Sequence, residues 1–394
     1  MPSRLNFAAC AAACCLAVAP ASAVATVLGL QDDSYAVTPT SQLDARLALT
    51  TATGARLARV DVFWSDVAPN KPVNPTDPAD PAYDWRALDA RITGLANANI
   101  TPLISVYSSP TWSTGGRFVA DTHYNPYAPA PGDYGNFMTA LAKRYNGTYI
   151  PAVYGITPLP RVRLIEVWNE PDLKRFFRVG NASSLSGYLR LLREAYPAVK
   201  AQNPTAIVIA GVGSPNATRG DGNVGSSAWL KGIVASPLSV KFDAYSQHIY
   251  PASAPLKRTK AFPSWSSISQ ILSTLDQRRA RQIAAVPKGR ARVKASRRPR
   301  MKLYITEAGY TTASTPFRKV RVSDAQQARY MRDILRAPQV VANRSRIPAI
   351  VWFNLMDNPN WPGGLLRADG SKKAAYATFT SLAGRGVLTP DLQR

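Results

Sequence analysis

The sequence predicts a (β/α)8 barrel that forms a single domain. Three observations support this fold class: eight apolar segments of strand length occur along the chain, helical segments separate most of them, and no internal repeat is visible. The 394 residues exceed an average domain, but barrels of this kind often exceed about 250 residues as one unit. An open doubly wound sheet is the alternative, and the count of eight strands favours the barrel.

The predicted strands are short runs rich in β-branched and aromatic residues, and turn-forming residues follow most of them. In chain order they cover residues 24–30, 58–63, 100–107, 162–167, 206–212, 242–250, 302–307 and 350–355.

Helices are predicted between the strands at residues 41–53, 83–99, 134–145, 185–201, 229–234, 268–285, 323–336 and 373–383. The segment 185–201 is clearly amphipathic, because Tyr188, Leu191 and Ala195 fall on one side. The segment 323–336 begins with Ser323 and Gln326, which match a capping box. Residues 64–82 repeat Pro, Asn and Asp, so we expect a long loop there.

Residues 1–23 are predicted to be a signal peptide, which leaves 24–394 for the barrel domain. Arg4 supplies a positive charge, residues 7–18 are apolar, and Ala21-Ser22-Ala23 matches a small-residue cleavage site. An uncleaved membrane anchor is the alternative, but the apolar stretch is too short to cross a bilayer comfortably. We therefore expect a secreted, extracellular protein without a transmembrane anchor.

Cysteine and histidine are scarce, which bears on metal binding. Cys10, Cys14 and Cys15 all lie in the predicted signal peptide, so a disulfide framework or a thiolate metal site is excluded from the rest of the chain. His123 and His248 are the only histidines, and two disfavour a histidine-built metal site. We expect neither a metal nor an organic cofactor.

The net charge of +24 is partly concentrated in residues 278–302, which contain eleven basic residues and no acidic one. This basic block could contact an anionic polymer, such as nucleic acid, acidic polysaccharide or cell-envelope phosphate. The alternative, which we favour, is a solvated helix end and loop. No nucleic-acid recognition motif is visible, so we expect no specific nucleic-acid partner.

Two glutamates stand at the ends of predicted strands. Glu170 lies in the motif IEVWNEPD of residues 165–172, and Glu307 ends the strand at 302–307. In a barrel the carboxyl ends of all strands line one mouth, so the two side chains should meet. Burial beside Trp168 would raise the pKa of Glu170 toward the range of a general acid. Two such carboxyl groups are what hydrolysis of a glycosidic bond requires, since one protonates the leaving oxygen and the other attacks or activates water. A turn-capping role for Glu170 is the alternative, and the presence of Glu307 argues against it.

Other residues near strand ends are candidates for substrate binding. Asn169 could hold a sugar hydroxyl, Tyr250 could orient the second glutamate, and Arg59 could keep that glutamate ionised. The aromatic side chains offer faces that suit the C–H faces of pyranoses. The candidate binding residues are Arg59, Trp112, Asn169, His248, Tyr250, Trp352 and Trp361. The alternatives are a structural ion pair for Arg59, a scaffold role for His248 and packing for the tryptophans.

The WNEP motif at 168–171 and the later Thr306-Glu307 resemble glycoside hydrolase clan A, the retaining (β/α)8 glycosidases. The resemblance extends from Arg59 to residues 363–379 and implies Glu170 as acid/base and Glu307 as nucleophile, with a covalent glycosyl-enzyme intermediate. His248, Tyr250 and Trp352 are similar to family 5 members. The stretch YSSPTWSTGG at 107–116 looks more like family 39 relatives. The third-strand histidine common in family 5 is absent, with Tyr107 or Ser108 in that region.

The prediction is therefore a secreted retaining β-glycosidase that acts on O-glycosidic bonds of a poly- or oligosaccharide. Two alternatives stay open: a non-catalytic carbohydrate-binding barrel, and a basic glycan-binding protein associated with the cell envelope. The separation of the two carboxyl groups is informative, because retaining enzymes need ~5–5.5 Å and inverting enzymes ~6.5–9.5 Å.

Overall fold

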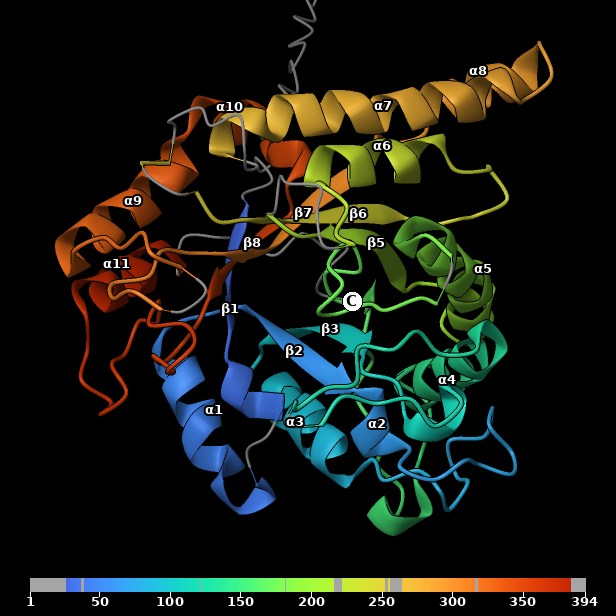
Figure 1. Ribbon diagram of the computed structural model, residues 1–394, viewed down its shortest axis with the longest axis horizontal. Helices are drawn as coiled ribbons and strands as arrows, with labels where there is room; N and C mark the ends of the chain where they lie inside the picture. The colour runs from blue at the N-terminus through green and yellow to red at the C-terminus, as the bar shows by residue number, and fades with distance from the viewer. Residues whose placement is uncertain are drawn as a thin grey trace, which may run out of the picture.

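The computed structural model describes residues 26–36, 39–120, 122–180, 182–215, 222–251, 254–255, 264–315 and 318–383. The predicted signal peptide at 1–23 lies outside these residues. Eight parallel strands pair in the order β1-β2-β3-β4-β5-β6-β7-β8 and close into a barrel, with helices around it (Figure 1). The predicted (β/α)8 fold is confirmed. Among the described residues, no helix has the length and apolar character to cross a membrane.

The strands lie within a few residues of their predicted positions. They are β1 (Val27–Gln31), β2 (Leu57–Phe63), β3 (Thr101–Tyr107), β4 (Leu164–Val167), β5 (Ile207–Gly213), β6 (Ala244–Ile249), β7 (Lys302–Ala308) and β8 (Ala349–Phe353).

The helices include three short ones that the sequence did not predict: α2, α8 and α10. All three span less than two full turns, which is too little for a periodic pattern to be visible. The α-helices are α1 (Leu43–Ala52), α2 (Trp64–Val67), α3 (Arg86–Asn97), α4 (Pro131–Arg144), α5 (Ser184–Gln202), α6 (Ser226–Ala235), α7 (Ile268–Ala284), α8 (Arg290–Ser296), α9 (Asp324–Arg336), α10 (Pro338–Ala342) and α11 (Ala374–Ala383). The 3-10 helices are η1 (Asp33–Ala36), η2 (Thr40–Gln42), η3 (Thr111–Ser113), η4 (Ala152–Tyr154), η5 (Trp265–Ser267) and η6 (Arg344–Arg346).

Apolar side chains from all eight strands form a separate cluster near the amino ends of the strands. Its buried members are Val27, Leu57, Leu103, Leu164, Ile209, Ala244, Tyr304, Ala349 and Val351. The outward-facing residues of the same strands pack in a larger cluster with the surrounding helices. Because side chains alternate along a strand, the inner cluster fills this part of the barrel and leaves the polar inward-facing residues near the carboxyl ends.

The basic block is partly structural. Arg278 is 1% exposed, and its guanidinium donates to the carbonyl oxygens of Ser236 at 3.0 Å and Val240 at 2.5 Å. Arg279 donates to the carbonyl oxygens of Ser296, at the end of α8, and of Arg298, just after it. Other members are exposed and have no ion-pair partner within the described ranges: Lys288, Arg290, Lys294, Arg297 and Arg298. Two of them, Arg290 and Lys294, belong to α8, which lies at the edge of the molecule (Figure 1).

Arg278→Met should lower the free energy of unfolding by about 3 kcal/mol, because several buried carbonyl oxygens would lose their donor. Arg290→Met, on the exposed α8, is the matched control and should change the free energy by less than about 0.5 kcal/mol. Urea unfolding followed by circular dichroism measures both values. Equal stability of the two variants would show that Arg278 is not a structural anchor.

Candidate active site

Glu170 is held in an unusual backbone conformation just after β4. Trp168 has φ 72° and Glu170 has φ 40°, both in the left-handed region that non-glycine residues rarely adopt. The fully buried Trp168 fixes this turn, since its Nε1 donates to the carbonyl oxygen of Phe176 at 2.8 Å. Such strain persists where surrounding contacts impose it, and it often marks functional sites. The turn leaves Glu170 4% exposed at the barrel mouth.

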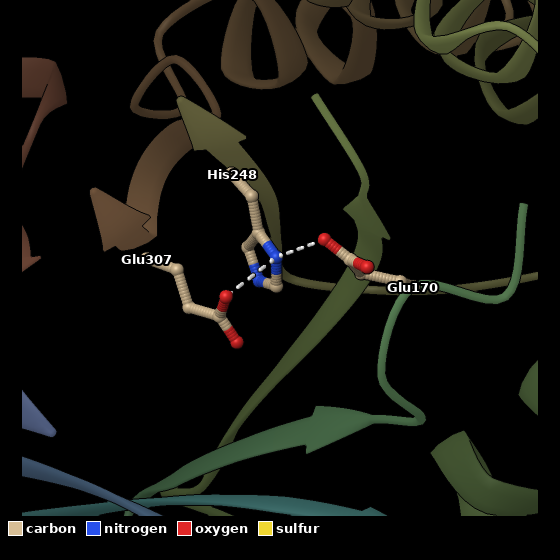
Figure 2. A group of neighbouring side chains, drawn as sticks. All are labelled: Glu170, His248 and Glu307. Atoms are coloured by element: carbon tan, nitrogen blue, oxygen red, sulfur yellow. Dashed lines mark hydrogen bonds and ion pairs between the residues drawn. The ribbon is translucent and has the colours of Figure 1, made fainter. Parts of the chain in front are cut away.

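Glu170 and Glu307 meet at His248 (Figure 2). His248 Nδ1 lies 2.8 Å from Glu170 Oε1 and 3.3 Å from Glu307 Oε2. The sheet explains the second contact, because His248 on β6 and Glu307 on β7 are register partners. One oxygen of each glutamate and one nitrogen of the histidine all lie within 4.8 Å of one another. The structure thus brings together three residues that the sequence predicted for the site.

Glu307 receives two further hydrogen bonds, one on each oxygen. The Tyr250 hydroxyl donates to Oε2 at 2.7 Å, and Arg59 Nη1 donates to Oε1 at 2.8 Å. Both donors favour the ionised carboxylate. Tyr250 and Arg59 therefore lie where the sequence placed them, next to the second glutamate.

Arg59, on β2, is fully buried and links side chains from four other strands, β1, β3, β4 and β7. Besides its bond to Glu307 on β7, the Nε of Arg59 donates to Glu166 at 2.8 Å. Its terminal nitrogens donate at 2.7–3.0 Å to the side chains of Gln31, Ser105 and Asn169. The hydrogen bond from Arg59 to the side-chain oxygen of Asn169 therefore fixes the orientation of the Asn169 amide. The structural ion pair weighed for Arg59 is present with Glu166, together with the contact to Glu307.

The three titratable groups influence one another strongly. Burial lowers the pKa of His248, but the charges of Glu307 and Glu170 outweigh it, and the net shift is upward. Burial raises the pKa of Glu170, as the sequence predicted, but His248 and Arg175 outweigh burial, so the net shift is downward and the predicted rise is wrong for the free protein. The pKa of Glu307 is raised, first by burial and then by the charge of Glu170, against the opposing effects of His248 and Arg59. In the free protein these directions favour an imidazolium beside an ionised Glu170.

Asp172, two residues after Glu170, is fully buried and accepts hydrogen bonds from the Ser214 backbone at 3.0 Å and the Ser214 hydroxyl at 2.6 Å. Burial and then the charge of Glu170 raise the pKa of Asp172 to about 7. Because this pKa exceeds the ordinary aspartate value of 3.8, the folded state binds the proton more tightly than the unfolded state does.

Stability should therefore fall as pH rises from about 4 to about 7, by up to about 1.4 kcal/mol per pH unit from this group. Asp172→Asn should remove this contribution, so the variant should gain stability relative to wild type across the same window. Thermal unfolding at a series of pH values tests this, with the exposed Asp44→Asn as control. A constant difference between Asp172→Asn and wild type at all pH values would contradict the assignment.

The aromatic residues divide into those at the mouth and those away from it. Trp361 packs edge-on against Tyr250 with ring centres 4.6 Å apart, and against Phe353 at 5.6 Å. Trp352 is 0% exposed and donates to the carbonyl oxygen of Gly363, so the structure does not bring it to the mouth. Trp112 packs on Trp64 and donates to the carbonyl oxygen of Ala68, also away from the glutamates.

Phe353 and Arg175 were missed from the sequence. Val351 points into the barrel, so alternation along β8 turns Trp352 outward and Phe353 inward. The sequence shows the alternation but not its direction, so it gave no reason to choose Phe353 over Trp352. Arg175 Nη2 lies 3.3 Å from Glu170 Oε2, and its side chain is 54% exposed. It belongs to the loop after β4, where no regular pattern indicates which side chain returns to the mouth.

The same cluster could in principle hold a metal ion. Within the described ranges, it is the one group of three potential ligands that lie close enough together, and its members are Glu170, His248 and Glu307. However, His248 Nδ1 already faces both carboxylates at hydrogen-bonding distance. A protonated ring nitrogen has no lone pair for a metal, and the raised pKa of His248 favours that form. The contacts therefore favour a hydrogen-bonded cluster over a metal centre.

A sequence model of the family described as Glycosyl hydrolases family 39 matches residues 70–344, which is more than half of the chain. The chain belongs to glycosyl hydrolases family 39. The family 39 match includes Glu170, His248 and Glu307. It agrees with the resemblance to clan A and, of the two families considered, with family 39.

The family 39 chain is also similar to individual proteins. It is 27% identical over 258 residues to a beta-xylosidase of Geobacillus stearothermophilus, in an alignment that covers 65% of this chain and 46% of that protein. The chain therefore spans about half of that relative.

Two solved structures share the fold. They are a glucosidase from Croceicoccus marinus (TM-score 0.62, 15% identity, 91% of this chain and 67% of that one) and a family 39 glycoside hydrolase from Bacteroides cellulosilyticus WH2 (TM-score 0.59, 19% identity, 91% and 63%).

Proposed function

We propose that this family 39 protein is a retaining β-glycosidase that hydrolyses O-glycosidic bonds in an oligo- or polysaccharide. The observation that carries the proposal is the meeting of Glu170 and Glu307 at His248, with one oxygen of each within 4.8 Å. This approach supports the ~5–5.5 Å geometry of retaining enzymes over the ~6.5–9.5 Å of inverting enzymes, which leave room for a water.

In the first step Glu307 attacks the anomeric carbon, and Glu170 protonates the leaving oxygen. The bonds from Arg59 and Tyr250 orient Glu307 and favour its ionised form, which this attack requires, against the opposing effect of burial. Glu170 needs a proton at this point, and the imidazolium of His248, 2.8 Å away, is its nearest source. In the second step Glu170 takes a proton from water, which displaces Glu307 and gives a product of unchanged anomeric configuration.

A panel of aryl β-glycosides tests the proposal, beginning with the xyloside and the glucoside because the similar proteins carry those names. Wild-type protein should release the phenol, and proton NMR of the first product should show the β-anomer. Initial formation of the α-anomer would overturn the retaining mechanism. No release from any glycoside, together with binding of a glycan, would favour the non-catalytic carbohydrate-binding barrel.

We also propose that the protein is exported, on the basis of the signal peptide that the sequence predicts at residues 1–23. Expression in a bacterial host should give a mature protein in the medium or periplasm that starts near residue 24. Amino-terminal sequencing checks the site. A retained full-length chain in the membrane fraction would contradict export as a cleaved protein.

The exposed part of the basic block supports a contact with anionic polymers. Replacing Lys294, Arg297 and Arg298 by Gln should weaken retention on an immobilised acidic polysaccharide, such as polygalacturonate, and leave hydrolysis of aryl glycosides unchanged. Unaltered retention at low salt would mean that these side chains are only solvated.

A further inference from the structure

A cavity of about 350 Å³ opens between the segment after β2 and the segment after β3. Its lining includes Asp66, Phe118, His123, Tyr124 and Asn125. None of the residues assigned above to the catalytic cluster lines it. The proposed reaction therefore leaves this cavity without a role.

Aromatic contacts connect the cavity to Glu170. Tyr124, on its wall, stacks on Phe176 with ring centres 5.0 Å apart and planes inclined by 28°. The guanidinium of Arg175 lies 4.6 Å from the centre of the Phe176 ring and contacts Glu170. The cavity therefore lies on the side of Glu170, the proposed acid. In hydrolysis the leaving group occupies that side, because Glu170 must reach the leaving oxygen.

The lining has the chemistry of a site for a neutral sugar. Phe118 is 62% exposed, so its ring is accessible to a ligand in the cavity. Asp66 is exposed and accepts a hydrogen bond from Ser65 at 3.3 Å, which leaves further acceptor positions on its carboxylate. The chain contains 48 Lys and Arg residues, yet none of them lines this cavity. An anionic ligand would find no Lys or Arg side chain on the wall, whereas a sugar could use an aromatic surface and hydrogen-bonding groups together.

We propose that this cavity is a leaving-group subsite that binds a further neutral sugar residue of the substrate. Phe118 supplies the apolar contact, and Asp66 with His123 binds hydroxyl groups. The proposal rests on the role assigned to Glu170, which defines the leaving-group side. It predicts that oligosaccharides long enough to fill the cavity are better substrates, because remote binding energy contributes to kcat/KM.

The test compares two substrate types for Phe118→Ala and Asp66→Asn. One is the β-glycosyl fluoride of the sugar that the aryl panel selects, whose single-atom leaving group cannot reach the cavity. The other is a series of β-1,4-linked oligosaccharides of the same sugar with two to five units. Each variant should lose about 10-fold in kcat/KM on the longest oligosaccharides and less than about 2-fold on the fluoride. Ile156→Ala, 90% exposed in the segment before β4, is the control and should affect neither.

Binding to the Glu307→Gln variant separates this proposal from the proposed function. Titration calorimetry with xylo-, cello- and manno-pentaose should show binding to at least one, weakened about 10-fold by the added Phe118→Ala. If the pentaose binds in this way but wild-type protein does not hydrolyse it, the cavity is a sugar-binding site and the proposed hydrolase function is wrong. Equal losses on fluoride and oligosaccharides, or binding that Phe118→Ala and Asp66→Asn leave unchanged, would overturn the subsite.

Discussion

Glu307→Gln should lower kcat/KM for aryl β-glycosides by about 10⁴-fold or more, because the amide cannot form the covalent intermediate. Gln keeps the size of the side chain, and Arg59 retains its ion pair with Glu166, so the fold should persist. Steady-state release of the phenol measures the loss, and circular dichroism checks the fold. Glu194→Gln, on the exposed face of α5, is the matched control among the four glutamates of the chain and should keep full activity.

Substantial residual activity in a folded Glu307→Gln variant would assign the nucleophile to another group. Trapping with a 2-deoxy-2-fluoro glycosyl fluoride gives an independent reading. Wild-type protein should gain the mass of one sugar on the peptide that contains Glu307, and the variant should gain none. Labelling of a different peptide would contradict the assignment directly.

Glu170→Ala should lower kcat/KM by about 10²- to 10⁴-fold for substrates with poor leaving groups and by much less for those with activated leaving groups, which need no proton. Sodium azide should restore turnover, because it can attack the glycosyl-enzyme without help from a base. The product should then be the β-glycosyl azide, after two displacements at the anomeric carbon.

The same assay on Glu307→Ala distinguishes the two roles. Any azide product formed there would result from one displacement and would be the α-glycosyl azide. If Glu170→Ala gave the α-azide and Glu307→Ala the β-azide, the two roles would be exchanged. Loss of activity that does not depend on the leaving group would argue that Glu170 is structural.

The sequence was sufficient for the barrel and for placing the side chains of Glu170 and Glu307 together at its mouth. Buried parallel strands are near-continuous apolar runs, and a polar residue at the end of such a run stands out, as Glu170 and Glu307 do. Trp352 looked as suitable for the mouth as its neighbour, because only the direction of alternation along β8 separates Trp352 from Phe353. That direction depends on the register of the closed sheet, which local patterns do not specify.

The loops were the part that the sequence could not place. The cavity beside Tyr124 forms where the segments that follow two different strands approach each other, and neither segment carries a periodic signal.

The basic block is a second case in which local sequence could not predict which side chains are buried. Arg278 is buried and structural while Lys294 is exposed, although both belong to one run of like charges. Only the packing of α7 against the end of α6 distinguishes them.

The bonding of Arg59 determines how much the site must rearrange during a reaction. Its planar group donates to five side chains on β1, β3, β7 and β4 with the turn after it, so the position of Glu307 is fixed when the barrel closes. An ammonium group could not reach all these acceptors at once, so lysine is not an equivalent here. The dipoles that face the reacting carbon are thus oriented during folding. A substrate would meet a preorganised field, with little reorganisation left for the passage to the transition state.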